Sequence, residues 1–140
     1  MNALRALHAL CRTPGFREIC LNEHKFTAST FDGYVREAIL LYKQSLDAAN
    51  AGTASTTLAD WGMYVNVCSS IVAFVDLFPE RLQEFQTIIP DLISVIKEKT
   101  ELARKNSAIL LAKLAKDEEN GKVMRAHHGH EVLVSLKDCL

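Results

Sequence analysis

The sequence predicts an all-α fold, and three observations support this prediction. Apolar residues recur at spacings of three and four along most of the 140-residue chain, as they do in helices that are buried on one face. Alternating β-branched runs joined by tight hairpin turns, which are typical of strands, do not occur. Glycine, proline and small polar residues interrupt the periodic runs at intervals that suit helix ends. We therefore expect a series of helices and no sheet.

The composition is that of an ordinary globular domain. A chain of this length can bury a sizeable core, and its 49% hydrophobic and 24% charged fractions exclude disordered and low-complexity classes. The net charge of -1 gives no excess of positive charge, so we expect no nucleic-acid partner. The sequence has no apolar run of about 18 residues, no signal-peptide pattern and no closely spaced cysteines. These features predict a cytoplasmic protein with reduced thiols and no membrane span.

The N-terminal part of the sequence predicts three helices. Pro14 and Gly15 break the first from the second, and Asp32 and Gly33 precede the third, since glycine and proline interrupt helical patterns. The predicted helices cover residues 1–12, 16–23 and 34–48. Residues 49–57 are small and polar, and we expect a mobile loop there.

The middle of the sequence predicts a long helix over residues 58–77 and a short one over residues 78–85. Thr57 with Asp60 three residues later is a variant of the capping box, which favours a helix start. Pro79 suits the first turn of the short helix, because the N–H that proline lacks has no partner at that position.

The C-terminal part predicts four more helices. The first is opened by Pro90, and Thr100 with Glu101 favours the start of the second. Gly129 suits a left-handed residue between the last two helices. The first of these helices is predicted to end near Lys99. The other three are predicted over residues 100–116, 121–127 and 131–140. The helix over 100–116 is expected to bury one face, formed by Ala103, Ser107, Leu110, Leu111 and Leu114.

The helices recur with a regular period. Aligning residues 72–76 with 112–116 gives a period of about 40, and aligning 92–96 with 133–137 gives about 41. Periods of about 40 to 47 residues are typical of solenoids with two or three helices per repeat. The predicted repeating units are residues 1–57, 58–99 and 100–140.

A known repeat pattern runs through residues 79–140. It consists of Ile-Pro-Asp-Leu-Ile-Ser-Val-Ile at 89–96, the Ala- and Leu-rich residues 103–115, Glu119 with Asn120, Gly129, and Leu-Val-Ser-Leu at 133–136. This pattern resembles the armadillo repeat, whereas residues 1–50 resemble it less and are equally similar to HEAT repeats. The resemblance implies a right-handed armadillo-like superhelix of about two and a half to three repeats, used as a protein-binding scaffold.

Both ends of such a solenoid carry apolar residues. Met1 begins inside an apolar helix, and Leu133, Val134 and Leu136 have no following repeat to cover them. We expect the chain either to be part of a longer solenoid or to associate with copies of itself through its end repeats.

The sequence contains no pattern of a catalytic or metal site. The segment from His127 to His130, with Cys139 nearby, lacks the ligand spacing of a zinc module and is interpreted as a turn. There is no nucleophile elbow and no glycine-rich phosphate loop. We therefore expect no catalytic residues, no metal and no cofactor, and an enzyme with an unrecognised site is the least favoured class.

Basic residues follow the helix predicted over residues 100–116. Lys105, Lys113 and Lys116 lie at helical spacings opposite its buried face, which is either a solvated surface or a binding surface. In armadillo proteins this helix lines the concave side, so the resemblance implies a groove bordered by these lysines together with Tyr64 and Asn66. Such a groove favours an acidic protein or peptide partner. The predicted function is a scaffold that docks a peptide or helical segment, with self-assembly through the end repeats as the alternative.

Overall fold

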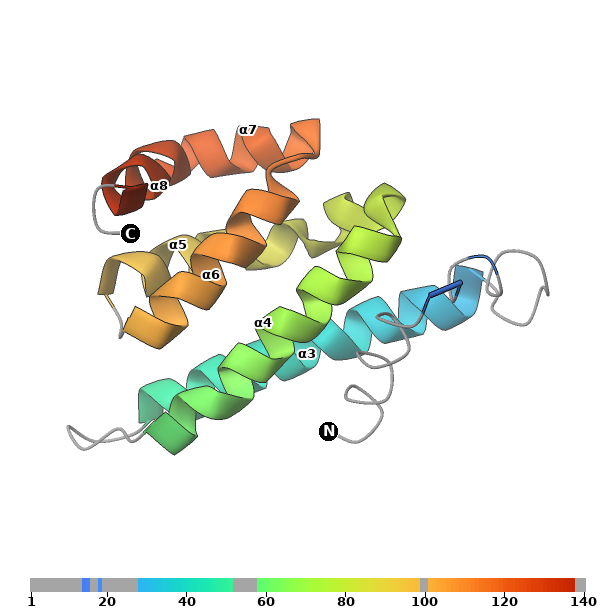
Figure 1. Ribbon diagram of the computed structural model, residues 1–140, viewed down its shortest axis with the longest axis horizontal. Helices are drawn as coiled ribbons and strands as arrows, with labels where there is room; N and C mark the ends of the chain where they lie inside the picture. Colours follow the sequence, from blue (N-terminus) through green and yellow to red (C-terminus); the bar gives the residue numbers. More distant parts are fainter. Residues whose placement is uncertain (1–13, 16–17, 19–27, 52–57, 99–100, 138–140) are drawn as a thin grey trace. The chain divides into compact units, whose positions relative to one another are not determined.

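The computed structural model describes residues 14–15, 18, 28–51, 58–98 and 101–137. Six α-helices and one 3₁₀ helix occupy nearly all of these residues, and no strand occurs among them, so the all-α prediction is confirmed (Figure 1). The elements are α3 (Ala28–Ala51), α4 (Leu58–Leu77), η1 (Pro79–Ile88), α5 (Ile89–Glu98), α6 (Glu101–Leu114), α7 (Glu118–Ala126) and α8 (Gly129–Lys137). The chain forms two compact units, a first unit over Met1–Pro79 and a second unit over Glu80–Leu140.

In the first unit, α3 and α4 pack side by side through a seam of aromatic rings. The ring centroids of Tyr42 and Tyr64 are 5.3 Å apart, and the Trp61 ring meets Tyr64 edge-on at the same distance. The Tyr34 ring lies 4.5 Å from that of Phe74. Such tilted and edge-on pairs add to the stabilisation that burial provides.

The helix predicted over residues 34–48 is longer in the structure. It spans Ala28–Ala51, so the prediction that Asp32 and Gly33 break the chain is wrong. Glycine inside a helix costs about 1 kcal/mol relative to alanine, which is small beside the Tyr34–Phe74 ring contact and the burial of Val35, the two residues that follow Gly33. The predicted loop over 49–57 begins inside this helix, and residues 52–57 lie outside the described part of the chain.

Two further predictions in the first unit differ in their outcome. The helix predicted over residues 58–77 is α4, with both bounds as predicted. The helices predicted over residues 1–12 and 16–23 fall outside the described part of the chain, apart from Glu18, which is helical.

The short helix predicted over residues 78–85 is the 3₁₀ helix η1, which is ten residues long. Its buried side chains are Leu82, Phe85 and Ile88. A spacing of three matches the three residues per turn of a 3₁₀ helix, so these side chains line up along one side of η1. In an α-helix the same row would drift around the axis, which explains why the tighter helix persists here over an unusual length.

In the second unit, α5 contacts α6, α7 and α8. Leu92, Ile93, Val95 and Ile96 of α5 are all buried, and they form the centre of an aliphatic interior. The helices predicted to end near Lys99 and to cover residues 100–116 correspond to α5 and α6. The predicted buried face of α6, Ala103, Ser107, Leu110, Leu111 and Leu114, is confirmed.

A buried asparagine fixes the start of α7. The Asp117 carboxylate caps the helix by accepting a hydrogen bond from the Asn120 backbone N–H at 2.9 Å. The Asn120 side-chain amide donates to the carbonyl oxygens of Leu82 in η1, at 2.8 Å, and of Leu114 in α6, at 3.0 Å. The prediction that this helix starts at Gly121 is therefore wrong by three residues, because Asp117 caps it earlier.

The turn between α7 and α8 differs from the prediction that Gly129 has a left-handed backbone. The residue with a left-handed backbone is His128, with φ 59°, and not Gly129. Gly129 is instead required by a close approach, since a Cβ atom there would lie 2.5 Å from Met124 Cγ and 3.0 Å from Ile93 Cδ1. Glycine at this position lets α5, α7 and α8 meet at one point.

Candidate protein-binding face of α6

Helix α6 has two opposite faces, one buried and one exposed. Successive residues of an α-helix turn by about 100° around the axis, so residues spaced by three, four and seven share a face. Seven residues fall within about a third of the circumference, opposite the buried row. We call this surface the α6 outer face, and it consists of Leu102, Lys105, Asn106, Ile109, Ala112, Lys113 and Lys116, which lies just after the last residue of α6.

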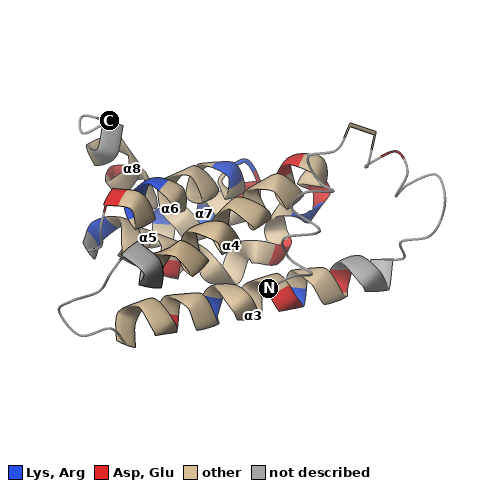
Figure 2. Ribbon diagram, turned by 60° about the horizontal axis from the view of Figure 1, so that its bottom comes forward, with Lys and Arg blue, Asp and Glu red and all other residues tan. Residues whose placement is uncertain are grey.

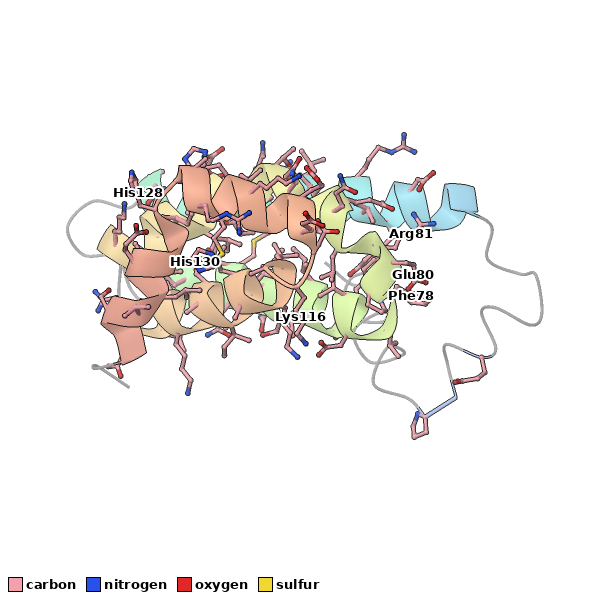
Figure 3. The ribbon with its side chains drawn as sticks, turned by 90° about the horizontal axis from the view of Figure 1, so that it is seen from above. Phe78, Glu80, Arg81, Lys116, His128 and His130 are labelled. Carbon is pink, nitrogen blue, oxygen red and sulfur yellow. The ribbon has the colours of Figure 1, made fainter. Side chains whose placement is uncertain are left out.

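The α6 outer face combines positive charge with apolar side chains. Lys105 and Lys116 are exposed, and Lys113 is half-buried. Leu102 is 40% exposed and Ile109 is 42% exposed, although both are large aliphatic residues. Glu101 is exposed at the edge of this face, one turn before Lys105. Figure 2 draws all Lys and Arg residues in blue, and Figure 3 labels Lys116.

Part of this charge has a purely structural explanation. Glu101 lies in the first turn of α6 and Lys113 in its last turn, an arrangement that complements the helix dipole. The helix dipole does not explain Lys105, because this residue lies in neither the first nor the last turn of the helix. The polar Asn106 side chain is turned along the helix, where it donates to the Leu102 carbonyl oxygen at 2.9 Å.

The sequence analysis singles out the lysines of this face but not Leu102 and Ile109, whose exposure only the structure shows. Both lie outside the row that predicts the buried face, and they are seven residues apart. An apolar pair at that spacing on the polar side of a helix is the signal that would have identified them.

Tyr64 and Asn66, the other predicted site residues, belong to α4 in the first unit. Tyr64 is fully buried, and its hydroxyl oxygen lies 3.1 Å from that of Tyr42, so its side chain is part of the interior packing. Asn66 is exposed, and its carbonyl oxygen accepts a hydrogen bond from the Ser70 hydroxyl at 2.9 Å. The groove that joins them to the three lysines stays a prediction, because it combines residues of two different units.

The histidine-rich turn lies at the junction of α7 and α8 (Figure 3). His128 Nδ1 is 3.6 Å from Glu131 Oε1, and both side chains are largely exposed. The pKa of Glu131 is lowered, first by a hydrogen bond from its own backbone N–H and then by His128 and His130. No three His, Cys, Asp or Glu side chains gather around a common point in the described residues, and Cys139 lies outside them.

Cys68 is the one cysteine within the described part of the chain. Its thiol is buried in the first unit, and desolvation raises its pKa to about 12 despite a hydrogen bond with Tyr64. A thiol that stays protonated at neutral pH is a poor nucleophile and a poor metal ligand. Cys68 therefore serves the packing of the first unit.

Comparison with known proteins finds no relative of this chain. No family model, no curated protein and no solved structure matches the chain. Within the described residues, no helix has both the length and the apolar character needed to cross a lipid bilayer. The function is therefore inferred from the geometry of the chain itself.

Proposed function

We propose that this chain is a protein-protein interaction scaffold that docks an acidic peptide or helical segment on the α6 outer face. The observation that carries this proposal is the combination of two exposed lysines, Lys105 and Lys116, with two exposed aliphatic residues on one face. Lysine attracts acidic segments over a distance, and aliphatic side chains contribute short-range affinity.

The proposed architecture is the right-handed armadillo-like superhelix of about two and a half to three repeats. The order of elements in the second unit supports it: the 3₁₀ helix η1, a helix with Pro90 in its first turn, the longer α6, and then two helices of nine residues each. In the armadillo resemblance, α6 is the third helix of a repeat, which lines the concave side. The α6 outer face would then be the surface that partners reach.

The test begins with random 16-residue peptides displayed on phage and selected on the full chain. We expect acidic peptides to be enriched. Their binding is then measured on the variant Lys105→Glu/Lys116→Glu, chosen because both side chains are exposed, whereas Lys113 is half-buried. The variant should bind more weakly, mostly through slower association, and the difference should shrink as salt is added.

The matched control is Lys97→Glu/Lys122→Glu, which makes the same change in net charge at exposed positions of α5 and α7. It should bind the selected peptides nearly as well as the wild type. The proposal fails if the selection enriches no acidic peptides, or if both double variants lose binding equally, since the effect would then come from net charge and not from this face.

Self-assembly through the end repeats is a second candidate, favoured by one observation. Val134 of α8 is 66% exposed, although it is aliphatic. If α8 mediates association with another copy, sedimentation at high protein concentration should show oligomers that Val134→Asp dissociates. A monomer at all concentrations would exclude this candidate.

A further inference from the structure

Two of the exposed aliphatic residues lie in line on the α6 outer face. In the described part of the chain, the exposed large aliphatic side chains are Leu40, Leu102, Ile109 and Val134. Exposed aliphatic residues that are scattered singly need no explanation. Leu102 and Ile109 are instead seven residues apart on one helix, which separates them by about 10.5 Å along its axis.

The surrounding positions have the spacing that a second helix requires. Leu102, Lys105, Ile109, Ala112 and Lys116 alternate at steps of three and four, which is the seam along which helices pack on one another. Ala112 is exposed and small, so the backbone of a partner helix can approach α6 closely there. The opposite side of α6 is already buried in the second unit, and the seam is therefore additional to the packing of the fold.

The distance between the two aliphatic residues favours a helical partner over an extended one. An extended segment covers about 10 Å in three residues, and residues three apart in a strand point to opposite sides. Its side chains could not both face α6. Residues seven apart in a helix share a face and span about 10.5 Å, which matches the separation of Leu102 and Ile109.

The charge of the face determines the charge of that helix. The exposed Lys105 and Lys116 flank the aliphatic positions. Glu101 borders the face one turn before Lys105, and the lysines outnumber it, so the face keeps an excess of positive charge. A partner helix that places aspartate or glutamate beside its apolar row would complement these lysines. A basic or neutral helix would bury the same apolar area without this electrostatic contribution.

We infer that the occupant of the α6 outer face is an acidic amphipathic helix of a partner protein, whose apolar side chains seven residues apart contact Leu102 and Ile109. This inference rests on the proposed function and specifies the conformation and pattern of the partner. Binding would pair two helices along the seam, with the lysines of α6 beside the carboxylates of the partner.

The experiment uses the acidic peptides selected on the full chain. Their sequences should carry apolar residues at spacings of three, four and seven, and a proline placed at the centre of a selected peptide should abolish binding because it breaks the helix. Fluorescence anisotropy of a labelled peptide should show that Leu102→Ala/Ile109→Ala weakens binding about tenfold or more.

Leu40→Ala is the matched control, since Leu40 is 56% exposed on α3 and outside the proposed surface. It should leave peptide affinity unchanged. If the peptides are acidic but tolerate the central proline, or bind Leu102→Ala/Ile109→Ala as tightly as the wild type, the helical inference fails while the proposed function stands. If no acidic peptide is selected, or binding does not depend on Lys105 and Lys116, the proposed function fails and the inference fails with it.

Discussion

The two units of the chain hold their helices together by different means. In the first unit, two long helices of 24 and 20 residues pack together through two groups of aromatic rings, one of which contains the paired Tyr42 and Tyr64 hydroxyls. In the second unit, the α-helices are only 9 to 14 residues long. Helices this short are marginal alone, so the second unit depends on single residues that fix its turns, above all Asn120 and Gly129.

This contrast predicts that a destabilising substitution in one unit affects the unfolding of that unit more than that of the other. The single tryptophan of the chain allows unfolding of the first unit to be measured separately. Trp61 is buried beside Tyr64, so its fluorescence reports unfolding of the first unit. Helical circular dichroism reports both units, and amide hydrogen exchange resolves individual helices. Substitutions that act on one unit should separate these signals.

The largest effect is expected for Asn120→Ala. The substitution removes both side-chain hydrogen bonds and leaves the Leu82 and Leu114 carbonyl oxygens without this donor, which should cost about 2 to 4 kcal/mol. Exchange protection should fall in η1, α6 and α7 while Trp61 fluorescence keeps its urea midpoint. Asn106→Ala is the control, because the Asn106 hydrogen bond is exposed. An equal loss of protection in α3 and α4 would show that the two units unfold together.

The next effect is expected for Gly129→Ala. The added Cβ would be forced against Met124 and Ile93, and overpacking of this kind costs about 1 to 3 kcal/mol. A double-mutant cycle with Met124→Ala, measured by urea unfolding, tests the cause. Gly129→Ala should cost less when Met124 is already truncated; an unchanged cost would assign the requirement for glycine to something other than this side-chain contact.

A smaller effect is expected for Tyr42→Phe in the first unit. The substitution removes one hydroxyl of a buried pair whose oxygens are 3.1 Å apart, and should cost about 1 kcal/mol. Tyr42→Phe/Tyr64→Phe should cost less than the sum of the two single changes, because both remove the same hydrogen bond. The urea midpoint of Trp61 fluorescence measures these differences. Additive costs would mean that the two hydroxyls are stabilised independently.

The same contrast separates what the sequence predicted from what it did not. The bounds of α4 and the buried face of α6 follow from periodicity, because both are determined by residues close together in the chain. The cap at Asp117 is also local, since it joins Asp117 to Asn120, and the prediction overlooked that signal. The burial of the Asn120 side chain and the close approach at Gly129 depend on contacts with α5, α6 and η1, which no local pattern contains. Gly33 is the reverse case. Its local preference predicts a break, but the packing of its neighbours overrides that preference and α3 continues through it.

The candidate site divides in the same way. Helical spacing places Lys105, Lys113 and Lys116 opposite the buried row. The α6 bounds include Lys105 and Lys113, whereas Lys116 lies in the turn that follows, since α6 ends at Leu114 and not at residue 116. The armadillo resemblance implies that Tyr64 borders a groove, but the environment of Tyr64 depends on α3, whose Tyr42 contacts its ring and its hydroxyl. Burial of an aromatic residue is decided by which helix packs against it, and sequence spacing within α4 does not contain that information.

The smallest effect on stability is expected for Leu102→Ala/Ile109→Ala on the α6 outer face. Truncating partly exposed side chains leaves no closed cavity, and alanine is a good helix former, so each of the two substitutions should change the free energy of unfolding by no more than about 0.5 kcal/mol. Leu110→Ala on the opposite face of the same helix should cost about 2 to 5 kcal/mol, because Leu110 is fully buried. Urea unfolding of the two variants measures both changes. A double variant that unfolds as easily as Leu110→Ala would show that Leu102 and Ile109 stabilise the fold itself, and their exposure would then need no partner to explain it.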